Sequence, residues 1–121
     1  MAKEASIVGN IHFVKGRMDV ELGSSFRLTI AGTQYVKYNQ NITQASEIAL
    51  ELGTLDSLGY AIIKNLDPTN FFTILTGTSG TVFAKVLPLG FALFHFGSGV
   101  TAPFALADTA DCEAEILILE P

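Results

Sequence analysis

The chain has 121 residues, the length of one domain, and it is unusually apolar, with 49% hydrophobic and only 16% charged residues. Its net charge of −5 argues against a nucleic-acid partner, because such a protein needs a basic face to neutralise phosphates. No run of about 18 uncharged apolar residues is present, and residues 1–10 lack the basic-then-apolar pattern of a signal peptide. We therefore expect no membrane partner and a protein made in the cytosol.

Strand signals dominate the first half of the chain, where β-branched and aromatic residues alternate with polar ones. They predict strands over residues 7–15, 18–22, 26–31 and 35–42. Two interpretations of residues 1–10 stay open: they begin the first strand, or they form an N-terminal arm that adds to a neighbouring subunit. Residues 46–52 alternate with period two, which favours a strand over a helix.

The second half contains the clearest hairpins. Strands are expected over residues 59–65 and 70–75, joined by a turn in which Pro68 presets φ and Asp67 accepts hydrogen bonds from nearby backbone amides. Further strands are expected over residues 82–87, 91–96, 102–107 and 112–119, with turns about every ten residues. This spacing predicts a single all-β domain over residues 1–121, an antiparallel β-sandwich or a barrel.

Several predicted strands are apolar on both faces, whereas an antiparallel sheet usually keeps one polar face in water. The last strand has a second face that begins with glutamates and ends with leucines. Either long loops of the same chain or other subunits must cover these faces, and we favour subunits because the chain is short and its loops are mostly Gly, Ser and Thr. The side chains expected in such an interface are Phe71, Leu75, Phe91, Leu93, Leu117 and Leu119.

The sequence offers few residues for catalysis, so we expect neither an enzyme nor a cofactor. His12 and His95 are isolated, and neither has the second histidine that a metal-binding barrel needs. Cys112 is expected to be a small buried apolar residue. Asp108 and Asp111 lie close in sequence, but their spacing lacks the glycine and the ligand count of a calcium loop, so we expect turn-forming aspartates and no metal.

Four segments carry a family resemblance: residues 48–54, 58–71, 83–90 and 107–120. They contain a Gly-Tyr strand leading to Asn-Leu-Asp-Pro-Thr-Asn, a Leu-Pro-Leu-Gly turn, and Ala-Asp-Thr-Ala before an acidic and then apolar last strand. Together they resemble small virion structural proteins of tailed bacteriophages. The turn departs from that family's pattern, because Leu89 stands between the proline and the glycine. The first 45 residues contribute nothing to the resemblance.

The resemblance implies a jelly-roll-like β-sandwich that acts as a capsid decoration, or cement, protein. Such proteins are commonly trimeric, and the expected partner at the virion surface is the major capsid protein or another virion protein. We therefore expect a homo-oligomer, with a trimer favoured, assembled on a capsid in the host cytoplasm. The alternatives are a tail, baseplate or fibre component of the virion, a receptor- or carbohydrate-binding module, and an enzyme on a β-barrel.

Overall fold

The computed structural model describes residues 5–121, and all regular elements in that range are β-strands. The chain divides into two compact units, one ending at Ala31 and the other spanning Gly32–Pro121. No helix in the described range is long and apolar enough to cross a membrane. The strands are β1 (Ala5–Lys15), β2 (Met18–Leu28), β3 (Tyr35–Ile42), β4 (Ile48–Ala49), β5 (Tyr60–Asn65), β6 (Phe72–Leu75), β7 (Val82–Val86), β8 (Phe91–His95), β9 (Phe104–Ala107) and β10 (Cys112–Leu119).

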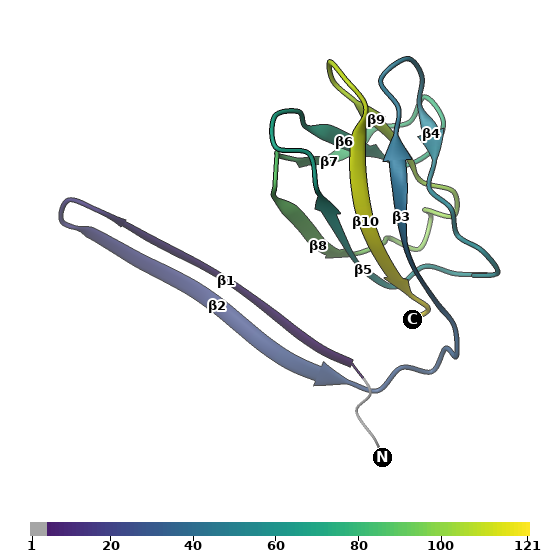
Figure 1. Ribbon diagram of the computed structural model, residues 1–121. Helices are drawn as coiled ribbons and strands as arrows, with labels where there is room; N and C mark the ends of the chain where they lie inside the picture. The colour runs from purple at the N-terminus through teal and green to yellow at the C-terminus, as the bar shows by residue number, and fades with distance from the viewer. Residues whose placement is uncertain (1–4) are drawn as a thin grey trace. The chain divides into compact units, whose positions relative to one another are not determined.

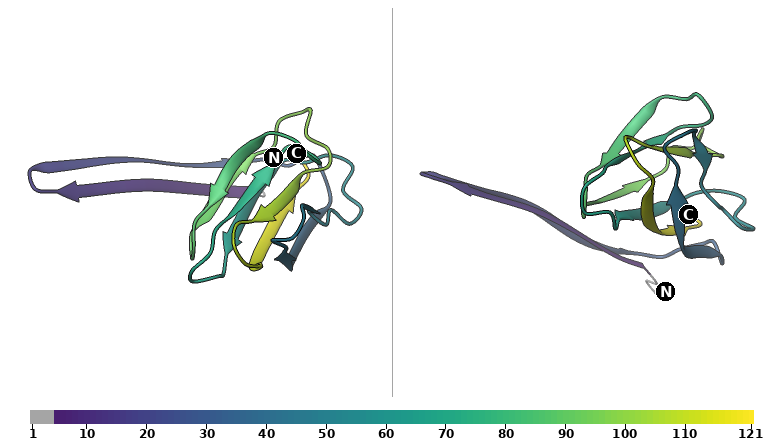
Figure 2. Two further views of the ribbon diagram at one scale, coloured as in Figure 1. Left: turned by 90° about the horizontal axis from the view of Figure 1, so that it is seen from above. Right: turned by 45° about the horizontal axis from the view of Figure 1, so that its top comes forward.

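The second unit is an antiparallel β-sandwich of two four-stranded sheets that lie face to face (Figures 1 and 2). One sheet has the order β3-β10-β5-β8, and the other has the order β4-β9-β6-β7. The strand pairs are nested, which means that the first strand of the unit pairs with the last, the second with the second-last, and so on inward. The pairs are β3 with β10, β4 with β9, β5 with β8, and β6 with β7. The expected all-β antiparallel sandwich is therefore confirmed, and the strands form open sheets rather than a closed barrel.

The sandwich core consists of the inward-facing side chains of both sheets. Alternate residues of β10 are fully buried, as period-two geometry requires, and their neighbours point outward. Phe72 and Ile74 of β6 meet them from the other sheet. Cys112 is buried in this core as predicted, and burial, followed by the nearby carboxylates of Asp67, Asp111 and Asp108, raises the pKa of its thiol. A buried thiol with a raised pKa is chemically inert.

The turn between β5 and β6 has the predicted chemistry. Oδ1 of Asp67 accepts hydrogen bonds from the backbone amides of Thr69 at 2.8 Å and Asn70 at 2.7 Å. Both bonds lower the pKa of the Asp67 carboxyl below its ordinary value, and the bond from Thr69 has the largest effect. The ionised side chain therefore stabilises the turn.

This turn predicts an acid-dependent loss of stability. Because the folded pKa of Asp67 lies below the unfolded value of 3.8, its contribution is present above that value and is lost as the pH falls through the folded pKa. The urea midpoint of the wild type should fall from about pH 5 to pH 2 more steeply than that of Asp67→Asn, whose amide oxygen accepts the same bonds without titrating. Asp56→Asn, at an exposed loop position, should keep the wild-type slope. Equal slopes for wild type and Asp67→Asn would contradict the assignment.

The strand predicted over residues 46–52 is much shorter in the structure. Only Ile48–Ala49 pairs as a strand, although Leu50 is buried as the alternation required. The reason lies in the side chain of Gln40, whose Nε2 donates to the carbonyl of Ala49 at 2.8 Å and whose Oε1 accepts from the amide of Glu51 at 3.2 Å. One buried amide side chain thus replaces the ladder bonds of a neighbouring strand.

The first unit contains a two-stranded hairpin of β1 and β2, which form a sheet of their own (Figure 1). A two-residue turn joins Lys15 to Met18, and its first residue, Gly16, has a φ of 59°, as a type II′ turn requires. β2 runs unbroken through residues 23–25, where the Gly-Ser-Ser sequence predicted a gap, because every residue there is paired with β1. Residues 5–10 belong to β1, and residues 1–4 of the proposed arm lie outside the described residues.

The division into units differs from the single sandwich expected over residues 1–121. The sandwich is built from residues 32–121, and the hairpin contributes no strand to either of its sheets. The physical reason is local pairing: a tight turn lets β1 and β2 satisfy each other's backbone groups along 11 residue pairs.

Candidate interaction surfaces

Four of the six predicted interface residues lie on one surface, the outer face of the β3-β10-β5-β8 sheet. Pairing places Leu117 of β10 opposite Ile62 of β5, and Ile62 opposite Leu93 of β8, so that an apolar row spans three of the four strands. Phe91 and Leu119 alternate onto the same face. We call this set, Leu117, Ile62, Leu93, Phe91 and Leu119, the outer apolar face.

Of the other two predicted residues, Leu75 belongs to β6 of the opposite sheet, and Phe71 lies immediately before that strand. Leu75 is only 5% exposed, so its assignment to an interface was wrong. An irregularity in β6 between Ile74 and Leu75 interrupts the alternation that predicted an outward side chain. Phe71 is half-buried beneath the ammonium group of Lys85, which lies 4.0 Å from the centre of its ring. Phe71 therefore does not join the outer apolar face.

A small charged cluster borders the outer apolar face. The carboxylate of Glu115 lies 3.5 Å from Nζ of Lys37 and 3.4 Å from Nζ of Lys64. The hydrogen bond from Lys64 and the charges of both lysines lower the pKa of Glu115. The outer face of β10 therefore changes from glutamates to leucines as predicted. The charge of Glu115 is balanced by one lysine from each neighbouring strand.

The turn between β7 and β8 exposes a second apolar feature that sequence reasoning missed. The amide of Gly90 donates to the carbonyl of Leu87 at 2.8 Å, and Pro88 and Leu89 occupy the two central positions. Leu89 has a φ of 58° and is 70% exposed. A leucine in this left-handed conformation costs about 1–2 kcal/mol, and glycine is the residue that favours it. We call the exposed side chains of Leu87, Leu89 and Phe91 the turn patch.

Strain at an exposed apolar residue is a feature that folding alone does not explain. Burial does not require a leucine at position 89, and the backbone disfavours it there. The signal in the sequence was Leu89 between a proline and a glycine, at a position where a turn with Pro at its second residue prefers glycine.

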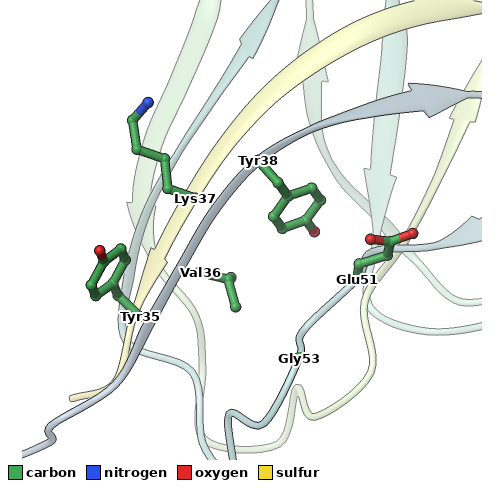
Figure 3. Close-up of a pocket in the computed structure, with 6 residues that line it drawn as sticks. All are labelled: Tyr35, Val36, Lys37, Tyr38, Glu51 and Gly53. Atoms are coloured by element: carbon green, nitrogen blue, oxygen red, sulfur yellow. The ribbon is translucent and has the colours of Figure 1, made fainter.

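A hollow of about 390 Å³ lies beside β3 and is lined by Tyr35, Val36, Lys37, Tyr38, Glu51 and Gly53 (Figure 3). Tyr38 and Glu51 face one side of the strand, whereas Lys37 and Tyr35 point to the other. Burial, followed by the charge of Glu51, raises the pKa of Tyr38 to about 12, so its phenol stays neutral. This hollow presents an aromatic and acidic surface without an activated acid–base pair.

The histidines and aspartates considered as candidate ligands have structural contacts. Nδ1 of His95 lies 2.7 Å from the carbonyl oxygen of Phe96, and its ring packs edge-on against Tyr60. Nε2 of His12 lies 2.8 Å from a carboxylate oxygen of Asp19 across the hairpin. Asp111 accepts a hydrogen bond from the backbone amide of Gln44 at 2.9 Å. Within residues 5–121, no three histidine, cysteine or acidic side chains converge as metal ligands would.

The hairpin carries an extended apolar surface, and six of its large side chains are exposed. Its register places alternate residue pairs on one face, and these are almost all apolar. We call this set the hairpin apolar face: Ala5, Ile7, Ile11, Phe13, Met18, Val20, Leu22, Phe26 and Leu28, interrupted by Gly9 and Ser24 and ending at Lys15. Leu22 is 82% exposed, and residues 5–31 of the hairpin unit form no further layer that covers it.

The opposite face of the hairpin is polar and internally bonded. Nδ2 of Asn10 donates to Oε2 of Glu21 at 3.0 Å, and His12 contacts Asp19 diagonally across the strands. Val8 and Val14 are its two apolar members. The hairpin is therefore amphipathic, with one face suited to water. The sequence signal was the alternation in residues 5–13 and 18–22, and it could be assigned to a face only when the register was known.

A scan against protein-family models gave no match for this chain, and neither did searches of curated proteins and of solved structures.

Proposed function

We propose that this protein is a structural component of a tailed-bacteriophage particle, a decoration protein that binds the capsid surface and stabilises the shell through subunit contacts. The family resemblance in residues 46–120 motivates the proposal. The nested strand pairs of the sandwich support it, because that order is the one expected of a jelly roll, an architecture common in viral capsid and lectin domains. In this proposal the chain is not an enzyme and acts without a cofactor.

The turn patch is the observation that carries the proposal. An exposed leucine held at a φ of 58°, beside Leu87 and Phe91, fits a binding contact better than a folding role. The outer apolar face begins at Phe91 and continues across the sheet, so the two surfaces share one residue. We propose that the major capsid protein covers the turn patch. Each contact is small, and many copies on one shell add their effects.

The proposal predicts opposite effects of one substitution on folding and on binding. Leu89→Gly should raise the free energy of unfolding by about 1 kcal/mol, because glycine tolerates the left-handed conformation. The same change removes the exposed side chain, so it should lower the occupancy of purified particles at least tenfold. Urea unfolding and pelleting with particles measure the two effects.

A matched control is available at Ser79, the other described non-glycine residue with positive φ, at 52°. Ser79→Gly should also stabilise the fold, and its backbone amide can still donate to Glu47. It should leave particle binding unchanged. If Leu89→Gly binds particles as tightly as the wild type, the turn patch is not the contact.

Copy number in purified particles distinguishes the two virion roles. Hundreds of copies per particle support capsid decoration, whereas a few to tens support a tail, baseplate or fibre component. A complete absence from particles contradicts both. A receptor- or carbohydrate-binding module is the second candidate, because Tyr35, Tyr38 and Glu51 line the hollow and the ring of Tyr38 lies on the same side of β3 as the carboxylate of Glu51. Binding to a glycan panel that is lost in Tyr35→Ala would favour this candidate.

A further inference from the structure

The hairpin apolar face needs a cover that the hairpin does not supply. A two-stranded hairpin in water is only marginally stable by itself, and this one exposes six large apolar side chains on one face. The exposed residues are Ile11, Phe13, Met18, Val20, Leu22 and Phe26. Its polar face carries the hydrogen bonds that were described above. The missing layer therefore belongs on one defined side of the hairpin.

We propose that the missing layer is the same face of a second copy of this chain, stacked face to face and antiparallel about a two-fold axis. This inference goes beyond the proposed function and does not depend on the role in a phage particle. In this arrangement β1 lies over β1 and β2 lies over β2 of the partner. The axis passes over the central pair Asn10 and Gly23, which lies midway along both strands.

The order of residues along the face is complementary to itself in this arrangement. On β2, Ser24 meets Leu22 of the other copy, and Phe26 meets Val20. On β1, Gly9 meets Ile11, and Ile7 meets Phe13. Each small residue thus receives a large one, which is the condition for a core without voids. A parallel stack would place Gly9 against Ser24 and leave a void there, and it would bring both Lys15 ammonium groups to one end.

Gly9 supports this arrangement independently. It lies inside a strand, where glycine weakens pairing, and its φ is not in the left-handed region. A Cβ atom built on it would meet nothing within 4 Å. Nothing in the described chain therefore requires glycine at this position. A strand glycine without a local reason commonly marks the close approach of another chain, and here it provides space for Ile11 of the second copy.

The area is sufficient for a stable pair. Each of the six exposed side chains can bury about 100 Å² of apolar surface, so two copies remove about 1,200 Å² from water, the lower limit for a specific interface. Apart from Lys15 at its end, the face carries no charge that would select an unlike partner. An uncharged, self-complementary face fits an isologous contact between identical chains.

Sedimentation of the full chain over a micromolar concentration series tests the pairing. The wild type should be a dimer, and Leu22→Lys should raise its Kd on the order of 100-fold or more, because both copies carry the change. Val14→Lys is the matched control on the polar face of the same hairpin, and it should leave Kd unchanged. A monomeric wild type, a trimer, or equal effects of both variants would overturn the proposal.

The antiparallel order has its own test. Ser24→Leu should weaken the dimer, because the new side chain meets Leu22 of the other copy. The double variant Ser24→Leu/Leu22→Ser exchanges the small and large positions and should restore the wild-type Kd. If Ser24→Leu alone tightens the dimer, the stack is parallel and the proposed geometry is wrong. If the chain's own sandwich or an unlike protein covers the face, the purified protein is monomeric. Failure of particle binding leaves these results unaffected, so the two proposals can fail separately.

Discussion

Phe72→Ala is expected to destabilise the sandwich by about 3–5 kcal/mol, the cost of removing a buried aromatic side chain and leaving a cavity. Phe72 is 0% exposed at the start of β6, where it pairs with residues of β7 and β9. Domains of this size have total stabilities of about 5–15 kcal/mol, so the variant should be partly unfolded at 37 °C. Urea unfolding followed by circular dichroism measures the loss.

Phe91→Ala provides the matched control for this prediction. It is the same substitution in the same unit, but Phe91 is 64% exposed. Its stability should stay within about 0.5 kcal/mol of the wild type, as is usual for surface positions. If the two variants lose equal stability, the assignment of inner and outer sheet faces is wrong.

Asn65→Asp should destabilise the sandwich nearly as much as Phe72→Ala, although the Asn and Asp side chains have the same size. Asn65 is 1% exposed, and its Nδ2 donates to the carbonyls of Asn70 at 2.8 Å and Val86 at 3.2 Å. Its Oδ1 accepts from the amide of Asp67 at 2.9 Å. A carboxylate removes both donors, faces two carbonyl oxygens and is buried, so we expect a loss of about 3 kcal/mol or more at pH 7.

The pH dependence of this variant gives the prediction a second readout. Burial raises the pKa of an introduced carboxyl in the folded state. The folded protein then binds more protons than the unfolded one, so the stability deficit against wild type should shrink as the pH falls from about 7 to about 5. Asn65→Ala lacks a titrating group, and its deficit should not change with pH. A pH-independent deficit for Asn65→Asp would show that the site is open to water.

The outcome for the predicted interface shows where sequence patterns were sufficient. Leu93 and Leu117 were assigned outward by alternation, and the sheet register brings them into one row through Ile62. Leu75 was assigned by the same rule, and the irregularity in β6 buried it. Alternation is reliable while a strand is regular, because it follows from backbone geometry alone, and it fails at a bulge, which the pairing with other strands decides.

The turn patch and the hairpin apolar face escaped prediction for different reasons. The conformation of Leu89 is a property of one turn, and the residue present is not the one that the conformation favours. The hairpin face depends on pairing Ile11 with Leu22 and Phe13 with Val20. A shift of one residue in that register would have mixed apolar and polar side chains on both faces.

The sequence by itself determined the strand content, the turn at Asp67, the burial of Cys112 and the apolar character on both sides of β8 and β10. These depend on a two-residue period and on turn chemistry, which act over a few neighbouring residues. The tertiary structure alone decided the nested pairing of the sheets, the separation of the hairpin, and the roles of Gln40 and Asn65, whose partners depend on how the loops fold back. These properties depend on contacts between residues far apart in the chain, and no local pattern specifies which distant segments meet. The turn patch, by contrast, depends on residues of a single turn. It was not predicted because Leu89 occupies a position where the backbone conformation favours glycine.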